Sequence, residues 1–263
     1  MVYEKFIKVT EDNQGRLLDI KFINNDDFNF GFDVVDYLGE NETTKNKTAM
    51  LWISVDGEEK RFTFADMKKY TSKTANYFKS IGINKGDRVM LVLRRNYQFW
   101  FSIVALHKIG AIAIPATDQL TKKDFVYRFN KAGVKAVICT SHGDVSEHID
   151  SSLPECETVE LKSMANGAKD GWLDFDKGIA EMSETFKRPT GADATKAEED
   201  TLMYFTSGTS GYPKIAAHTH TYALGHFITA KYWHNVDPNG IHFTISDTGW
   251  GKAVWGKLYG QWL

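Results

Sequence analysis

Residues 88–115 read RVMLVLRRNYQFWFSIVALHKIGAIAIP, and this stretch decides the fold. After Arg88, the next five residues form a continuous apolar run, so residues 88–93 indicate a buried strand, and residues 112–115 form a second one. The apolar side chains between them cover most of a helical circumference up to Gly110, which predicts a helix packed on more than one side. Strands that are apolar on both faces are typical of a parallel sheet covered by helices.

The same alternation continues on both sides of this stretch. Downstream, Thr121 opens a helix with Phe125 and Phe129 on its inner face, and residues 134–140 form another strand. Upstream, Thr63 and Asp66 have the spacing of a capping box that begins a helix ending at Gly82. Residues 51–64 around Asp56-Gly57 predict a hairpin. We therefore expect an α/β fold with doubly wound, mostly parallel sheets flanked by helices and right-handed crossovers.

Three segments are expected along the chain. Residues 1–50 form an N-terminal arm with loops, residues 51–190 a first α/β subdomain, and residues 191–263 the start of a second. In the last segment we expect strands at 201–205, 215–217 and 241–246, and a helix over about 221–233. The inner face of that helix would hold Ala223, Phe227, Ala230 and Trp233. A further helix starts near Trp250, where Asp247 is its expected cap, and no stop signal follows, so truncation is expected.

Composition excludes several classes of protein. Among 263 residues, 32 Lys and Arg stand against 34 Asp and Glu, so no basic excess suggests nucleic-acid binding. The most apolar stretch, 99–115, is interrupted by His107 and Lys108 and is too short to span a membrane. Cys139 and Cys156 are too few for a disulfide framework or a CxxC metal site. A reducing, cytoplasmic location is expected from this cysteine usage.

One loop carries most of the chemistry, and it reads YFTSGTSGYPK over residues 204–214. Gly208 and Gly211 permit backbone conformations that let amides point at an anion, four hydroxyls can donate to phosphate oxygens, and Lys214 adds a positive charge. The spacing is not that of a Walker P-loop, because no hydroxyl residue follows the lysine to hold Mg²⁺. A solvent-exposed turn rich in Ser and Gly is the alternative, and it is rarer with this density of hydroxyls.

The loop resembles the core motif of the adenylate-forming superfamily, and its surroundings resemble the acetyl-CoA and medium-chain acyl-CoA synthetase branch. Lys214-Ile-Ala-Ala-His218 resembles the KxxxH that follows the loop there, and residues 246–250 read SDTGW as in that branch. Upstream, GDRV at 86–89 and KIGAIAIPAT at 108–117 also match. The resemblance covers about residues 28–263.

This resemblance implies that ATP and a short- or medium-chain carboxylic acid form an acyl-adenylate and pyrophosphate, and that CoA then displaces AMP. Trp250 would line the acyl pocket, although a core tryptophan at the start of a helix is an equal alternative. The ligands of Mg²⁺, adenine and ribose and the catalytic lysine would lie beyond residue 263, so we expect this chain alone to be inactive. The expected ligands of the β- and γ-phosphates are Thr206, Ser207, Gly208, Thr209, Ser210, Gly211 and Lys214.

Other interpretations remain open from the sequence. The chain could belong to another adenylate-forming ligase, such as an aryl-CoA ligase or an amino-acid adenylation domain. It could also be a phosphate- or nucleotide-binding fragment without catalysis. His218 and His220 form an HxH pair, but no acidic or cysteine partner accompanies them, so packing is a better explanation than a zinc site.

Overall fold

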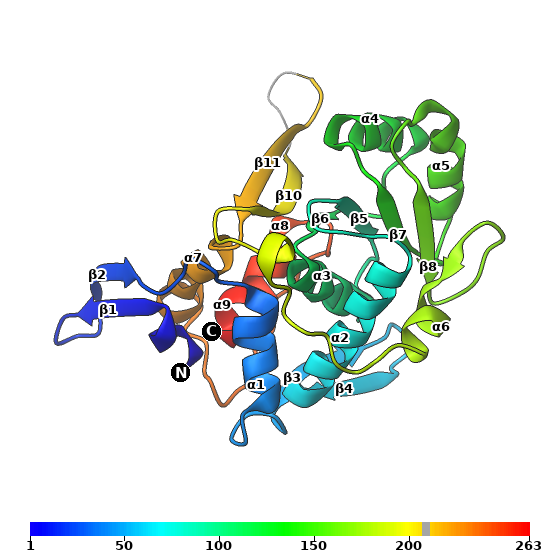
Figure 1. Cartoon of the computed structure of the whole chain (residues 1–263). Helices are drawn as coiled ribbons and strands as arrows, with labels where there is room; N and C mark the ends of the chain where they lie inside the picture. Colours follow the sequence, from blue (N-terminus) through cyan, green and yellow to red (C-terminus); the bar gives the residue numbers. More distant parts are fainter. Residues whose placement is uncertain (207–210) are drawn as a thin grey trace.

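The central element is a seven-stranded sheet in the order β11-β10-β6-β5-β7-β8-β9 (Figure 1). The computed structural model describes residues 1–206 and 211–263. Neighbouring strands are parallel except for the antiparallel pair β10–β11, so the mostly parallel α/β fold is confirmed. The strands are β5 (Arg88–Val92), β6 (Ile112–Pro115), β7 (Ala136–Thr140), β8 (Leu161–Ala165), β9 (Leu173–Asp174), β10 (Asp200–Thr206) and β11 (Lys214–Thr219).

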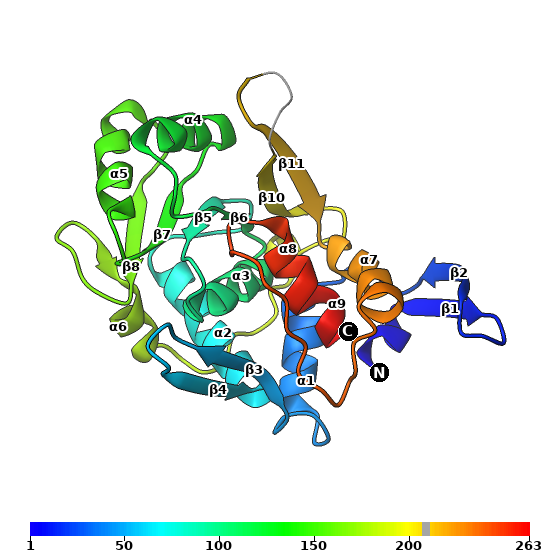
Figure 2. The same ribbon diagram turned by 180° about the vertical axis from the view of Figure 1, so that it is seen from behind.

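Helices cover both faces of this sheet, as a doubly wound fold requires. Alternate side chains of β5 face opposite ways: Val89 and Leu91 enter one core, and Met90 and Val92 enter the other. The first core is closed by α2 (Phe64–Ser80) and α3 (Gln98–Ile109), and the second by α4 (Lys122–Ala132) and α5 (Val145–Ser152) (Figures 1 and 2).

Local sequence signals define where these helices begin and end. Capping boxes open α2 at Thr63 and α4 at Thr121, and Gly110 and Gly133 end α3 and α4 in the left-handed conformation. All twelve residues of α3 are buried, which confirms that this helix packs on several sides.

Smaller elements surround the central sheet. Two antiparallel pairs are formed by β1 (Ile7–Glu11) with β2 (Leu17–Phe22) and β3 (Thr48–Ile53) with β4 (Glu59–Thr63), the second being the expected hairpin. The short helices are α1 (Tyr37–Glu40), α6 (Phe175–Ala180), α7 (Tyr222–Ile228), α8 (Gly251–Val254) and α9 (Gly260–Trp262). Helical turns of 3₁₀ type lie at Val2–Lys5, Leu153–Glu155 and Gly191–Asp193, and π-helical turns lie at Gly31–Asp36, Thr229–Trp233 and Trp255–Tyr259. The division of the chain into segments at residues 50 and 190 stays a prediction. Strand β10, from the third segment, is hydrogen-bonded beside β6, from the second.

Two expectations for the C-terminal segment are wrong. Residues 241–246 form no strand, because no described segment pairs with them, and Ile241, Phe243 and Ile245 face outward. Trp233 is 82% exposed although Ala223, Phe227 and Ala230 are buried as expected. The helix widens to a π-helix over Thr229–Trp233, which shifts the helical phase and turns Trp233 outward. No helix in residues 1–206 or 211–263 has the length and hydropathy needed to cross a bilayer.

Candidate functional site

The candidate site lies at the carboxyl edge of the sheet, where β5 and β6 end. The chain leaves β5 toward α3 on one face of the sheet and leaves β6 toward α4 on the other. Ligands of open α/β sheets bind outside the carboxyl ends of the strands. Because β10 lies parallel to β6, its carboxyl end at Thr206 opens on the same edge.

The segment 246–250 reaches this edge of the sheet from the far end of the chain. The hydroxyl of Thr248 donates to the carbonyl of Arg94, which directly follows the apolar run of β5. A Cβ at Gly249 would lie 2.3 Å from the backbone nitrogen of Thr117, which follows β6. The glycine therefore allows the segment to lie directly on the backbone at the end of β6.

Two further contacts hold the same region in place. Asp247 Oδ1 accepts the Gly249 N–H at 2.9 Å, so this carboxylate caps the turn, and the helix α8 begins after Trp250 instead. Arg94, with a φ of 50°, pairs through Nε with Asp118 Oδ2 at 2.9 Å. Sequence reasoning missed Arg94 and Thr248. For Arg94 the available signal was its position directly after an apolar strand, since such residues meet at the carboxyl edge of a parallel sheet. Thr248 had no such signal, because residues 241–246 form no strand.

Trp250 is 68% exposed, so the alternative of a core tryptophan is wrong. Its backbone is fixed by the N–H bond to the Asp247 carbonyl at 3.1 Å, and its side chain remains accessible at the start of α8. A role in an acyl pocket stays a prediction.

The hairpin β10–β11 carries the expected phosphate loop. Thr206 and Lys214 are opposite each other in the ladder, and the Thr206 hydroxyl donates to the Lys214 carbonyl at 3.3 Å. Gly211 has a φ of 107°, which few other residues adopt. Lys214 is exposed, and no ion pair among the described residues involves it. Ser207, Gly208, Thr209 and Ser210 lie outside the described residues.

Basic residues also lie beside the segment 246–250. Arg95 is exposed directly after Arg94, and Lys257 Nζ donates to the Ser246 carbonyl at 3.5 Å. Burial lowers the pKa of Lys257, and the nearby charge of Arg95 lowers this pKa further. The nearby carboxylate of Asp247 raises the pKa of Lys257 and so partly offsets the repulsion from Arg95.

The HxH pair is divided between two environments. His220 is 2% exposed, and burial lowers its pKa to about 4, so the ring is neutral at pH 7. His218 is half-buried, with its ring 4.0 Å from the ring of Tyr222. Within residues 1–206 and 211–263, no three His, Cys, Asp or Glu side chains come together in a way that could hold a metal ion.

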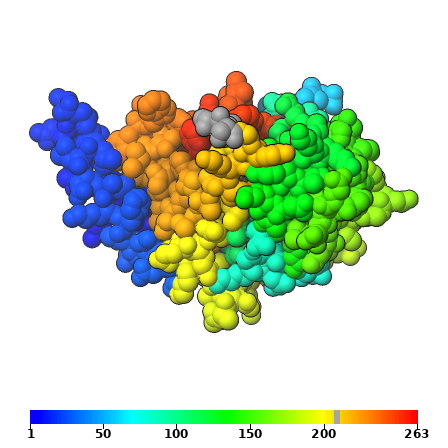
Figure 3. Space-filling view, turned by 90° about the horizontal axis from the view of Figure 1, so that it is seen from above, coloured from blue at the N-terminus to red at the C-terminus, as the bar shows by residue number. Residues whose placement is uncertain are grey.

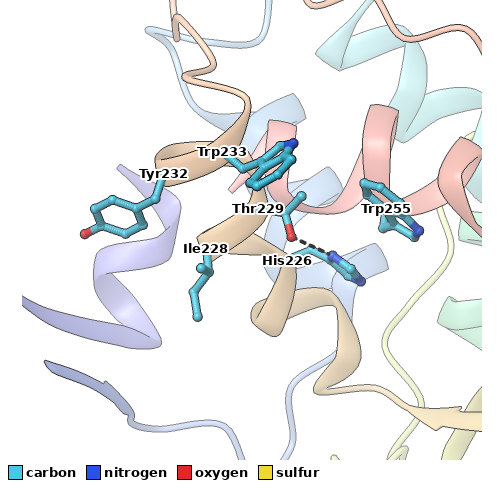
Figure 4. Close-up of a pocket in the computed structure, with 6 residues that line it drawn as sticks. All are labelled: His226, Ile228, Thr229, Tyr232, Trp233 and Trp255. Atoms are coloured by element: carbon cyan, nitrogen blue, oxygen red, sulfur yellow. Dashed lines mark hydrogen bonds between the residues drawn. The ribbon is translucent and has the colours of Figure 1, made fainter. Parts of the chain in front are cut away.

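A separate pocket of about 460 Å³ lies on α7 and the helical turns that follow it (Figure 4). The rings of His226 and Trp255 are nearly parallel at 5.6 Å, and His226 Nδ1 lies 3.2 Å from the Thr229 hydroxyl oxygen. None of the predicted site residues that the structure describes lines this pocket. The lining residues are His226, Ile228, Thr229, Tyr232, Trp233 and Trp255.

Curated relatives cover most of this chain but are much longer. The human acyl-coenzyme A synthetase ACSM3, mitochondrial, is 32% identical over 242 residues, which are 90% of this chain and 40% of that protein. The mouse acyl-coenzyme A synthetase ACSM4, mitochondrial, is also 32% identical over 242 residues, with 90% and 41% coverage. The chain thus spans about 40% of the length of these relatives. Both relatives are named as mitochondrial, so the expected cytoplasmic location is wrong.

Solved structures share the fold. An anthranilate CoA ligase, AuaEII, crystallised with anthranoyl-AMP, matches 89% of this chain and 43% of its own, with a TM-score of 0.75 at 22% identity. An acyl-CoA synthetase from Brucella canis matches 89% of this chain and 41% of its own, with a TM-score of 0.74 at 24% identity. At these identities the likeness supports the architecture alone.

Family membership follows from the sequence match itself. Residues 40–256 match the family described as AMP-binding enzyme, and this range includes the central sheet, the hairpin β10–β11 and the segment 246–250. The chain therefore belongs to the AMP-binding enzyme family.

Proposed function

We propose that this chain forms the phosphate-binding part of an AMP-forming acyl-CoA synthetase. The observation that carries the proposal is the meeting of two distant segments at one sheet edge. The hairpin stems with Thr206 and Lys214 open there, and the segment 246–250 lies on the ends of β5 and β6 at the same edge. Such an edge is the usual ligand-binding place in this fold class.

The chemistry of the proposed reaction explains these residue types. A carboxylate is a poor electrophile, and transfer to AMP gives it a good leaving group, with pyrophosphate released. The acid and the triphosphate of ATP are both anions, so the protein must offset their repulsion. Lys214 supplies an accessible cation and Thr206 a hydroxyl, and the glycine at 211 leaves room for the backbone to approach phosphate. Ser207, Gly208, Thr209 and Ser210 complete the proposed ligand set in sequence.

We assign Trp250 to the acyl group of a short- or medium-chain acid. The support is its accessibility, together with the placement of its neighbours Thr248 and Gly249 on the strand ends. Arg95 and Lys257 add positive charge beside this segment, which suits an anionic acid.

ATP and CoA are the proposed co-substrates. Mg²⁺ would neutralise charge on the triphosphate, and none of its ligands is assigned in this chain. A mitochondrial location is proposed from the names of the relatives.

Acid-dependent exchange of pyrophosphate into ATP tests the proposal in the full-length protein. Butyrate and octanoate should support exchange, while benzoate and amino acids should not. Exchange with benzoate or an amino acid alone would favour the other adenylate-forming ligases. If calorimetry shows that the protein binds ATP, but none of the acids supports exchange of pyrophosphate into ATP, the protein would be a nucleotide-binding module. We expect residues 1–263 alone to show no exchange.

A further inference from the structure

Helix α4 lies beside the hairpin that carries the phosphate loop, as the space-filling view from above shows (Figure 3). A single residue of this helix, Tyr127, contacts both sides of the loop. Its ring packs against Phe205, near the start of the loop, at 6.3 Å in an edge-on arrangement. The same ring stacks on Tyr212, near the end of the loop, at 4.6 Å and 20°. Its hydroxyl donates to the Pro213 carbonyl at 2.8 Å.

The next residue of α4 strengthens the contact with the first stem. The guanidinium of Arg128 lies 5.3 Å from the ring centre of Phe205, within the range of a cation–π contact. Asp124 holds Arg128 at 3.1 Å, and Asp124 also forms the capping box that begins α4. The first stem is therefore tied to the fixed start of a helix.

Helix α4 is itself a rigid support for these contacts. Phe125 and Phe129 are fully buried in the second core, on the inner side of the helix. Tyr127 lies between them in sequence and is half-buried toward the hairpin. By contrast, β11 is the last strand of the sheet and pairs on one side with β10 alone. The contacts of Tyr127 thus connect an edge hairpin to the core at both ends of the loop.

We propose that Tyr127 is a positioning residue that clamps both ends of the phosphate-binding loop and so fixes where Lys214 lies for ATP; this assignment rests on the function proposed above. Tyr127 touches neither substrate in this assignment. It acts through Phe205, Tyr212 and Pro213, which are all within one or two residues of Thr206 or Lys214. Losing the clamp should weaken ATP use and leave use of the acid unchanged.

Two variants of the full-length protein separate the parts of the clamp. Tyr127→Phe keeps the stacking and loses the hydrogen bond, whereas Tyr127→Leu loses both. The matched control is Tyr77→Phe, which removes a hydroxyl 2.9 Å from the Ser163 hydroxyl on the far side of the sheet from α4. In ATP–pyrophosphate exchange, KM for ATP should rise about threefold in Tyr127→Phe and about tenfold or more in Tyr127→Leu. KM for the acid should not change, and the control should keep both values.

An unchanged KM for ATP in Tyr127→Leu, or an equal rise in the control, would overturn the assignment. A second measurement does not depend on the reaction. Amide hydrogen exchange at residues 205, 206, 214 and 215 should become about tenfold faster in Tyr127→Leu, while exchange in β5 and β7 stays unchanged. If the unaltered protein shows no ATP–pyrophosphate exchange with any of the acids tested, the proposed function fails. Unchanged protection at these four amides would disprove the clamp itself.

Discussion

Charged and polar groups around the end of α3 are buried and paired, whereas those at the carboxyl edge of the sheet include an exposed cation. Lys108 is wholly buried, and its ammonium contacts Asp36 at 2.6 Å and the Ser72 hydroxyl at 3.1 Å. The ring of His107 lies between the hydroxyls of Thr201 and Tyr259, at 2.7 Å from each. At the edge, Lys214 is exposed and finds no carboxylate partner among the described residues.

Burial and pairing distinguish cations that stabilise the fold from cations that can bind a ligand. Burial raises the pKa of Asp36 and lowers that of Lys108, because water no longer solvates either charge. Such a pair is retained when each charge satisfies the other. A cation that folding leaves accessible at a ligand-binding edge is available for an anionic substrate. Four predictions test this comparison.

Removing one member of the buried pair should have the largest effect. In Asp36→Leu the Lys108 ammonium is left buried without its carboxylate, so the free energy of unfolding should fall by about 3–5 kcal/mol. Urea unfolding followed by circular dichroism measures this loss. Glu42→Leu, which breaks the exposed pair with Lys45, is the control and should change little. Equal losses in both variants would mean that burial does not distinguish the two pairs.

Removing the exposed cation should change activity without changing stability. In the full-length protein, Lys214→Met should lower the rate of ATP–pyrophosphate exchange by roughly 10²–10³-fold, the usual cost of removing one group that stabilises developing charge. Its urea unfolding midpoint should match that of the unaltered protein. Lys21→Met, at an exposed lysine on β2, should keep full activity. A Lys214→Met protein with normal exchange would exclude this lysine from the site.

Crowding the contact of the segment 246–250 should have an intermediate effect. Gly249→Ala places a Cβ 2.3 Å from the Thr117 nitrogen, so the segment must move, with a loss of about 1–3 kcal/mol in unfolding free energy and a higher KM for the acid. The control is Gly225→Ala in α7, where a Cβ would meet no atom within 4 Å. This substitution should not lower the free energy of unfolding. Full stability of Gly249→Ala would show that the close approach is not required.

The smallest effect concerns pH and the buried His220. Its pKa of about 4 is below the ordinary 6.5, so the unfolded chain takes up the proton first as pH falls. The stabilising contribution is complete above pH 6.5 and is lost between 6.5 and 4, with a slope of about 1.4 kcal/mol per pH unit. When the pH is lowered from 6.5 to about 5.5, the free energy of unfolding should therefore fall by about 1 kcal/mol less in His220→Leu than in the unaltered protein. Urea titrations at both pH values measure the difference, and identical slopes would contradict it.

Much of the fold was predictable because its signals are local. The apolar runs at 88–93 and 112–115 and the capping boxes at Thr63 and Thr121 depend on neighbouring residues alone. The alternation in Ile241, Phe243 and Ile245 is equally local, yet it led to a wrong strand, because a strand also needs a partner that alternation cannot supply. The change to a π-helix after Ile228 likewise turned Trp233 away from its expected face.

The candidate site was predictable in its residue types and not in its assembly. The density of hydroxyls and glycines before Lys214 identified the loop, and SDTGW identified the second segment. Their common position at the ends of β5, β6 and β10 depends on contacts between distant parts of the chain. Thr248, for example, contacts Arg94, which lies 154 positions earlier. Nothing in the local pattern around Tyr127 indicated that this residue contacts Pro213, 86 positions later.

By itself, the sequence determined the alternation of strands and helices between residues 63 and 140, the starts of α2 and α4, the end of α3, and the family to which the chain belongs. These properties follow from hydrophobic periodicity, capping and motif spacing, which act over a few residues. The tertiary structure decided which cations are buried in pairs, which glycine lies against backbone, and which side chains share the carboxyl edge. Those properties depend on packing between distant segments, and packing exists only once the whole sheet has formed.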